Sequence, residues 1–170
     1  MNRAQELTAS DIVNTWDEEE LIEVFQKYGE VRSPYKIVKA ILLDRKTKPF
    51  ESTIDLAGMI ERVAGWRRKG KHPATQYFLG LRLVVNQELE QTAECLPLMI
   101  KALSPGGIIV VLTFHSLEDR IVKRYFKEAD KVMSLGRRLN NKVVIATDEE
   151  QKGNPRSRSA KLRAFQKDLS

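Results

Sequence analysis

The segment from His115 to Arg120 holds the densest set of side chains that could take part in catalysis. His115 is followed by the hydroxyl of Ser116 and the carboxylates of Glu118 and Asp119. An imidazole near carboxylates can accept and return a proton at neutral pH, and a hydroxyl can hold a polar substrate. The same spacing also fits an ordinary helix start, since Ser116 and Asp119 stand three residues apart. Spacing alone leaves both interpretations open.

Two basic segments are candidates for binding an anion such as an RNA backbone. The first comprises Arg67, Arg68, Lys69, Lys71 and His72, and the second comprises Arg156, Arg158, Lys161 and Arg163. The first lies just before Pro73, where a helix is predicted to begin, and the exposed amides and dipole of a helix start favour negative charge. Both segments also fit a purely structural interpretation: the first could be a solvated loop between domains, and the second could be the solvent-exposed face of a terminal strand.

The net charge supports a polyphosphate partner. The sequence carries 29 Lys and Arg against 23 Asp and Glu, which gives +6 and a pI of about 9.5. From Lys123 onward there are 13 basic and 6 acidic residues, so the excess lies in this part of the chain. Clustered Lys and Arg are typical of nucleic-acid binding, although a merely soluble basic surface has the same composition. No basic amphipathic helix suggests a membrane surface as the partner.

Composition excludes several classes. With 170 residues, 42% of them hydrophobic, the chain is expected to be globular and long enough to bury a core. Its longest apolar run, Ile108 to Phe114, is too short to span a membrane, and no signal peptide is recognisable, so the expected location is the cytoplasm. Cys95 is the only cysteine, which rules out an internal disulfide, and no metal site is predicted. None of the nine glycines forms a GxG or P-loop pattern, so no cofactor-binding residues are predicted in this chain.

The first part of the chain is predicted to be helical. Capping boxes are expected at Thr8 with Asp11 and at Thr15 with Glu18, and the second is expected to open a helix that ends at a left-handed Gly29. Two more helices are expected, over about residues 35–45 and from a Ser52 cap to Gly65. A long helix then follows Pro73 and continues to Leu103, bent or divided by Pro97.

The second part changes its period. The continuous β-branched run Ile108 to Phe114 predicts a strand buried on both faces, as in parallel or mixed sheets covered by helices. A helix from Ser116 and extended segments over 143–146 and 160–165 follow. The fold class is therefore α/β, with a helical domain over 1–70, a helical connection over 71–104 and a sheet-containing part over 105–170. So few strands cannot make a sheet covered on both faces, so partner strands are expected from elsewhere.

Several long motifs, in order, closely resemble the RsmH (MraW) family. They are Thr8 through Glu30, Lys71-His72-Pro73-Ala74-Thr75, Arg82 to Asn86 with Glu88-Leu89, Thr113-Phe114-His115-Ser116-Leu117-Glu118-Asp119-Arg120-Ile121-Val122-Lys123, and Asn154-Pro155-Arg156-Ser157-Arg158-Ser159-Ala160-Lys161-Leu162-Arg163. The resemblance covers nearly all of this chain. The chain lacks a match to the family's N-terminal half, which contains the glycine-rich cofactor loop and the first strands.

The resemblance implies an S-adenosylmethionine-dependent methyltransferase of cytosine N4 in small-subunit rRNA. It implies a helical substrate domain followed by the C-terminal part of a Rossmann-like class I methyltransferase sheet, without the N-terminal strands. His115, Ser116, Glu118 and Asp119 would then border the base pocket, and the basic segments would contact rRNA or the ribosomal subunit. We expect the chain alone to bind no S-adenosylmethionine and to be inactive. A truncated gene product, a misplaced start, a subunit completed by a separately encoded N-terminal half, and a noncatalytic RNA- or ribosome-binding module remain the alternatives.

Overall fold

The chain forms two compact units in a computed structural model that describes residues 7–65 and 72–169. Unit 1 comprises Met1–Glu88 and unit 2 comprises Leu89–Ser170. The boundary falls inside the helical connection that the sequence predicts. Each unit has its own hydrophobic core, and the two are described separately below.

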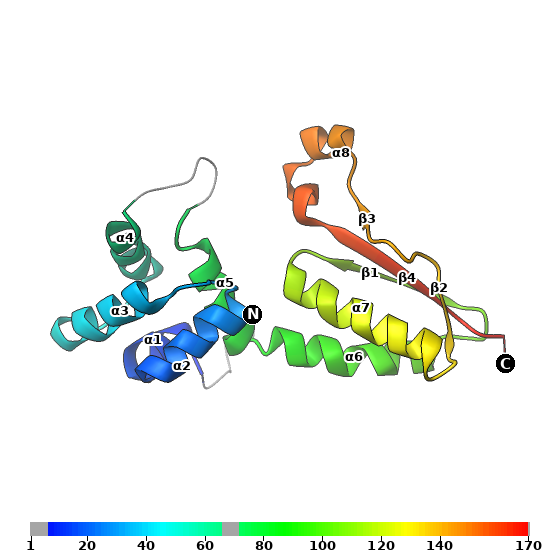
Figure 1. Cartoon of the computed structure of the whole chain (residues 1–170), viewed down its shortest axis with the longest axis horizontal. Coiled ribbons are helices and arrows are strands. Elements are labelled where there is room, and N and C mark those ends of the chain that lie inside the picture. The colour runs from blue at the N-terminus through cyan, green and yellow to red at the C-terminus, as the bar shows by residue number, and fades with distance from the viewer. Residues whose placement is uncertain (1–6, 66–71, 170) are drawn as a thin grey trace. The chain divides into compact units, whose positions relative to one another are not determined.

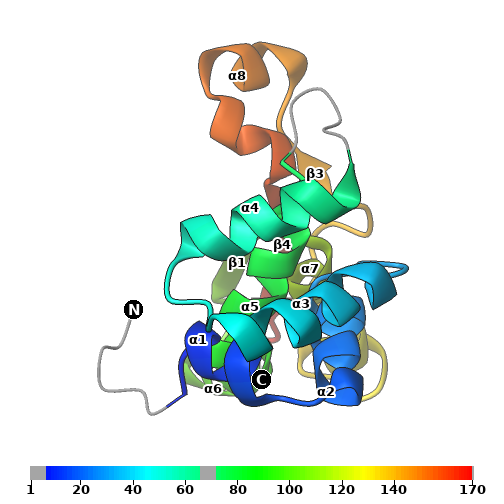
Figure 2. The ribbon, with the colours of Figure 1, turned by 90° about the vertical axis from the view of Figure 1, so that its left-hand side faces the viewer.

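Unit 1 is entirely helical in the part that the structure describes. Its elements are α1 (Ala9–Thr15), α2 (Glu18–Glu23), the π-helical turn η1 (Val24–Tyr28), α3 (Tyr35–Thr47), α4 (Thr53–Ala64) and α5 (Thr75–Val85). Each helix turns its apolar residues inward, and the core contains Ile12, Leu21, Phe25, Val38, Ile41, Ile60 and Leu81. In Figure 2, α3 lies beside α4, with which it packs. Burial of these faces is the main force that holds the short helices together.

Helix starts in unit 1 follow the sequence signals only in part. The predicted boxes at Thr8 with Asp11 and the cap at Ser52 are confirmed. The predicted box at Thr15 is wrong, because Asp17 caps α2 and Glu20 completes the box. Thr15 instead ends α1, and its Oγ1 donates to the carbonyl oxygen of Asp11. Pro73 precedes α5 by two residues and does not begin the helix.

Gly29 is required for a different reason from the one predicted. Its φ of −86° lies in the right-handed region, so it is no left-handed cap, whereas Gly65 is one, with φ +77°. A Cβ on Gly29 would lie 2.7 Å from the carbonyl oxygens of Phe25 and Gln76. Gly80 of α5 lies against the same turn, with the Gly29 nitrogen 3.1 Å from the place of a Cβ. The pair of glycines lets η1 and α5 approach backbone to backbone.

The long predicted helix is divided, but Pro97 is not the cause. It breaks between α5 and α6 (Glu88–Ala102), where Gln87 adopts a positive φ of 50°. Pro97 lies within α6, and the helix continues through it. A proline interrupts only one backbone hydrogen bond of a helix, which packing of Leu96 and Ile100 into the core of unit 2 offsets.

Unit 2 contains a small antiparallel sheet. Its remaining elements are β1 (Ile108–Thr113), α7 (Ser116–Lys131), β2 (Gly136–Arg138), β3 (Val144–Ile145), α8 (Asp148–Gly153), the 3₁₀ turn η2 (Pro155–Ser159) and β4 (Lys161–Lys167). β4 is central, because β1, β2 and β3 all pair with it. The register places Ile109 opposite Phe165 and Leu112 opposite Leu162. The sequence predicts β1, β3 and β4 to within about two residues, but not β2 or α8.

Helices cover one face of this sheet. Figure 1 shows α6 and α7 on the same side of β1 and β4. Phe126 of α7 packs against Phe165 of β4, with ring centroids 5.4 Å apart, in a core that also holds Leu96, Ile100 and Val122. The prediction that β1 is buried on both faces is wrong for the described residues. Alternate residues of β1 are exposed: Ile108, Val110 and Leu112 are each more than half exposed.

The class is mixed α/β, as predicted, with a purely antiparallel sheet in the described residues. The chain supplies too few strands there for a parallel, doubly covered sheet. A search of the described residues for membrane spans found no helix long and apolar enough to cross a bilayer.

Candidate active-site corner and basic surface

The turn from β1 into α7 is built around His115. This residue caps α7: its backbone is extended, and its Nδ1 accepts a hydrogen bond from the amide of Glu118 at 3.4 Å. The cap is thus His115 and not the predicted Ser116, which is the first residue of the helix. Nε2 of His115 lies 3.1 Å from Oε1 of Glu118, and only 11% of the histidine side chain is exposed. One imidazole therefore holds the helix start and faces a carboxylate.

Glu118 closes the same turn from the other side. Its second carboxylate oxygen accepts a hydrogen bond from the amide of Phe114 at 3.1 Å. Burial raises the pKa of Glu118, but hydrogen bonds and charge from His115 and the Phe114 amide outweigh it, and the pKa lies below its ordinary value. Glu118 is therefore an anion at neutral pH, and it faces the imidazole of His115.

Asp119 is committed to Arg163. The guanidinium donates from Nε to Oδ1 at 2.6 Å and from its terminal nitrogen to Oδ2 at 3.1 Å, which joins α7 to β4. Burial raises the pKa of Asp119, but the hydrogen bonds and charge of Arg163, with the charges of Lys161 and Lys123, outweigh burial and hold the pKa below its ordinary value. Arg163 is only 8% exposed. Its guanidinium faces this carboxylate and joins α7 to β4, and its role in binding RNA stays a prediction.

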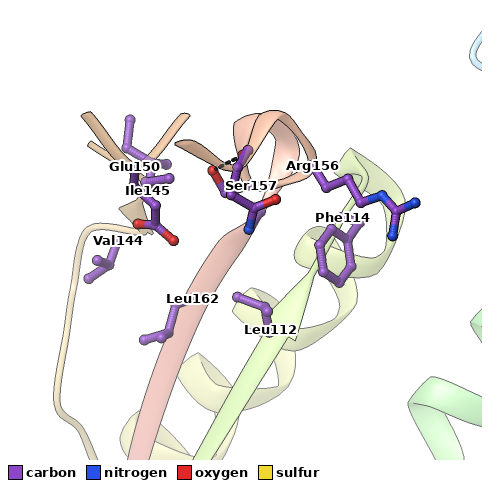
Figure 3. Close-up of a pocket in the computed structure, with 11 residues that line it drawn as sticks. Leu112, Phe114, Val144, Ile145, Glu150, Arg156, Ser157 and Leu162 are labelled. Atoms are coloured by element: carbon purple, nitrogen blue, oxygen red, sulfur yellow. Dashed lines mark hydrogen bonds between the residues drawn. The ribbon is translucent and has the colours of Figure 1, made fainter. Parts of the chain in front are cut away.

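A groove of about 480 Å³ borders this corner. Figure 3 shows Leu112, Phe114 and Leu162 along one side and Val144 and Ile145 along the other. Polar groups close the end near η2, where the Ser157 hydroxyl donates to the Asn154 carbonyl oxygen at 2.8 Å and Arg156 and Glu150 line the rim. The groove is thus apolar in its body and charged at its mouth, a combination suited to a flat ligand with a polar edge.

The remaining basic residues divide by position. Arg67, Arg68, Lys69 and Lys71 lie outside the described residues. His72 stands before α5: its Nδ1 accepts from the amide of Ala74 at 3.1 Å, and its Nε2 lies 3.7 Å from a Glu61 oxygen. In unit 2, Arg156 and Arg158 on η2 are exposed, and Lys161 is half-buried at the start of β4. The two exposed arginines are free to approach an anion only from the η2 side of unit 2.

Sequence reasoning missed the groove and the Asp119–Arg163 pair. Val144 and Ile145 are a short polar-flanked strand, and only their pairing with β4 brings them opposite Leu112. Asp119 and Arg163 are 44 residues apart. No local spacing signals such contacts. Knowledge of the strand register would have indicated the pair, because Arg163 lies opposite Val111 on the sheet face that α7 covers.

Comparison with known proteins identifies the family. A model of the MraW methylase family matches residues 1–168. The ribosomal RNA small subunit methyltransferase H of Bdellovibrio bacteriovorus is 56% identical over 98% of this chain and 50% of its own length. The proteins of the same name from Coprothermobacter proteolyticus and Thermomicrobium roseum are 45% and 44% identical, over 54% and 53% of their lengths. The chain thus spans about half the length of these relatives. It belongs to the MraW methylase family.

Proposed function

We propose that this sequence is the C-terminal portion of an S-adenosylmethionine-dependent methyltransferase that modifies cytosine N4 of a small-subunit rRNA. The observation that carries the proposal is the 56% identity to a named rRNA methyltransferase over 98% of the chain. Identity at this level over a whole segment supports the same chemistry when the segment is part of a complete enzyme. In that enzyme, unit 1 is the substrate domain and unit 2 completes the catalytic domain.

The methyl donor is bound elsewhere in the complete enzyme. β1 passes directly into α7 at His115, and no glycine stands between Gly107 and Gly136, so this turn has no loop that would let a backbone wrap a ligand. We therefore expect the described residues of this chain not to bind S-adenosylmethionine by themselves. The donor site belongs to the portion of the relatives that this sequence does not match, supplied in the same polypeptide or by a separately encoded N-terminal half.

The corner formed by His115, Ser116, Glu118 and Asp119 borders the target base. Modification of an exocyclic amine releases a proton, and a buried imidazole that faces an anionic carboxylate is a competent acceptor. In this proposal Nδ1 of His115 takes the proton as it releases the amide of Glu118, and the Glu118 carboxylate stabilises the imidazolium at Nε2. Asp119 with Arg163 fixes the start of α7. Ser116 stands at the first turn, beside the base.

The basic residues bind the rRNA. Arg67, Arg68, Lys69, Lys71 and His72 of unit 1, with Arg156, Arg158 and Lys161 of unit 2, would contact its phosphates. RNA is recognised largely through shape and backbone, which suits cations spread over loops and helix starts.

The proposal is tested with a chimera. The unmatched portion of the Bdellovibrio bacteriovorus relative, joined to this chain, is expected to transfer a labelled methyl group from S-adenosylmethionine to small-subunit rRNA. The chain alone is expected to give no transfer and no heat on calorimetric titration with S-adenosylmethionine. A chimera that binds the donor and the rRNA without transfer would instead support the noncatalytic RNA-binding alternative.

The role of His115 is tested in the same chimera. His115→Asn keeps a capping side chain but cannot take up a proton, so we expect turnover to fall at least tenfold while the melting temperature changes little. Normal turnover in His115→Asn would leave His115 with the capping role alone.

A further inference from the structure

A cavity of about 430 Å³ lies in unit 1, between the end of α3, the loop that follows it and α4. Its inner wall is apolar, because Phe50 and Met59 line it and are only 7% and 5% exposed. Charged side chains also line it, namely Asp44, Lys48, Asp55 and Arg62. An apolar wall with a few polar groups around it is typical of a site for a small or flat ligand.

The loop on one side of the cavity is held in place by α1. Oδ1 of Asn14 accepts from the amide of Phe50 at 2.9 Å, and Nδ2 of Asn14 donates to the carbonyl oxygen of Phe50 at 3.0 Å. The hydroxyl of Ser10 donates to the same oxygen at 3.1 Å. Ser52 then caps α4. The walls of the cavity are thus fixed before a ligand arrives, which lowers the ordering cost of binding.

The charges that line the cavity balance. Arg62 donates to Oδ2 of Asp44 at 2.6 Å. A hydrogen bond from Ser52, together with the charge of Lys48, holds the pKa of Asp55 below its ordinary value. Two cations and two carboxylates therefore line the same cavity, so a bare phosphate would gain little there. A better ligand donates a hydrogen bond to a carboxylate and places an apolar face against the inner wall.

A nucleobase combines these two properties. Its ring is flat, and the amino groups of adenine, cytosine and guanine donate hydrogen bonds that a carboxylate can accept. In single-stranded RNA the edges of unstacked bases are accessible to a protein. In the described part of the chain, the contact with Arg62 engages Oδ2 of Asp44 and leaves Oδ1 without a donor. Asp44 can therefore accept from an amino group while it keeps its ion pair.

We infer that this cavity binds one unpaired nucleotide of the rRNA whose base carries an amino group, with that group donating to Asp44 and the ring lying against Phe50 and Met59. The inference rests on the proposed function, which supplies RNA as the partner. The nucleotide differs from the methylated one, which the corner of unit 2 takes in that proposal. The cavity adds recognition of a base to contacts that otherwise involve phosphates.

Inosine tests the contact with Asp44, because it carries a carbonyl oxygen where adenosine carries the amino group. Two fluorescein-labelled RNA pentanucleotides, with adenosine or inosine between pairs of uridines, are titrated with the whole chain and followed by anisotropy. We expect the adenosine probe to bind at least about threefold more tightly, and Asp44→Ala to bring this ratio to about 1. Glu23→Ala is the matched control. Glu23 also forms an exposed ion pair, with Lys27 at 3.1 Å, and its loss should leave the ratio unchanged.

The direction of the change separates base recognition from attraction by net charge. Each variant removes one negative charge, so attraction by net charge alone would tighten the binding of both probes in both variants. Loss of the amino contact instead weakens the binding of the adenosine probe to Asp44→Ala. Equal Kd values of the two probes for the wild-type chain, or an unchanged ratio in Asp44→Ala, would overturn the inference.

Methionine methyl groups give a second readout that does not depend on a variant. Met59 lines the cavity, whereas Met99 and Met133 belong to unit 2. In a chain labelled with carbon-13 at its methionine methyl groups, the ring of the bound adenosine probe should shift the nuclear magnetic resonance signal of Met59 and leave those of Met99 and Met133 in place. A Met59 signal that does not move at saturation, or shifts confined to Met99 and Met133, would refute the cavity as the site.

The chimera separates this inference from the proposed function. A chimera that methylates rRNA, with equal affinity of the chain for the two probes, would refute the nucleotide site and leave the function intact. A chain that prefers adenosine through Asp44, in a chimera with no transfer, would refute the methyltransferase function and leave the nucleotide site intact.

Discussion

Asp119 belongs to the candidate active-site corner, but its carboxylate is engaged in an ion pair that holds two elements of unit 2 together. Its carboxylate and the guanidinium of Arg163 are largely buried, with 13% and 10% of the side chains exposed, and they bond in bidentate geometry. A buried ion pair gains little over an apolar pair, but loss of one partner leaves an uncompensated charge in the protein. Loss of Asp119 should therefore cost more stability than loss of a carboxylate from a solvent-exposed ion pair.

Asp119→Asn is expected to lower the free energy of unfolding of unit 2 by about 3 kcal/mol, because Arg163 stays buried without its counter-charge. Urea unfolding followed by circular dichroism measures the loss. Asp44→Asn is the matched control, since the Asp44–Arg62 pair has the same 2.6 Å contact but side chains that are 39% and 66% exposed. It should cost less than about 1 kcal/mol. Equal losses would show that the buried pair is no more important than the exposed one.

The same pair predicts an acid-sensitive step. The pKa of Asp119 lies below its ordinary value of 3.8 in the folded chain, so the folded state binds this proton less readily than the unfolded state. The resulting stability is fully present above about pH 5 and is lost as the pH falls through the lowered pKa. Melting temperatures measured between pH 7 and pH 3 should drop less in Asp119→Asn than in the wild-type chain. Parallel curves would assign the acid sensitivity to other carboxylates.

At the scale of elements, signals within one turn of a helix were predictable and contacts between elements were not. The Ser52 cap and the stop at Gly65 bound α4 as expected, because both act through neighbouring backbone atoms. Thr15 and Asp17 both offer capping spacing, and the choice between them depends on how α1 packs. The short strand Gly136–Arg138 has no apolar alternation and exists only through its pairing with β4.

The candidate site divides in the same way. The sequence predicts the corner at the carboxyl end of β1, since the β-branched apolar run Ile108 to Phe114 stops just before His115. It could not assign His115 and Asp119 to their partners. His115 takes the capping position that Ser116 and Asp119 also offer by spacing, and the partner of Asp119 comes from β4, which is distant in sequence.

The close approach of η1 and α5 gives a matched glycine test. Gly29→Ala is expected to destabilise unit 1 by more than about 1 kcal/mol, because its Cβ would press on two backbone oxygens at 2.7 Å. Gly58→Ala, within α4 and with nothing inside 4 Å, should stabilise it by about 0.5 to 1 kcal/mol. Tryptophan fluorescence on heating reports both changes, since Trp16 packs against this core. A tolerated Gly29→Ala would mean that η1 and α5 can separate at little cost.

For the whole molecule, the main feature is the uneven charge. The segment from Lys123 onward carries 13 of the 29 basic residues but only 6 of the 23 acidic ones. It includes η2, where Arg156 and Arg158 are exposed. Binding that depends on phosphate contacts weakens steeply as salt rises, because each contact releases condensed counterions.

Arg156→Gln combined with Arg158→Gln is expected to weaken binding to a small-subunit rRNA fragment several-fold and to reduce the slope of log Kd against log salt by about 1 to 2. Filter binding at several salt concentrations measures both quantities. Lys36→Gln combined with Lys39→Gln removes the same charge from the exposed side of α3 and should change the slope less. If both double variants changed the slope equally, η2 would contribute only through the net charge of the chain and not through specific phosphate contacts.

The central position of β4 has a consequence for synthesis. In the described part of unit 2, every other strand hydrogen-bonds to β4, and β4 is made after all of them. While the chain emerges from the ribosome, β1, β2 and β3 lack the strand of this chain with which they pair. Helices α6 and α7 therefore cannot pack against the complete sheet until Lys161–Lys167 has left the ribosomal tunnel. Unit 1 has no such dependence and can fold first. Nascent unit 2 is thus exposed to proteases and chaperones for the time needed to add about 50 residues after β1, and premature termination before Lys161 would abolish the whole sheet in one step.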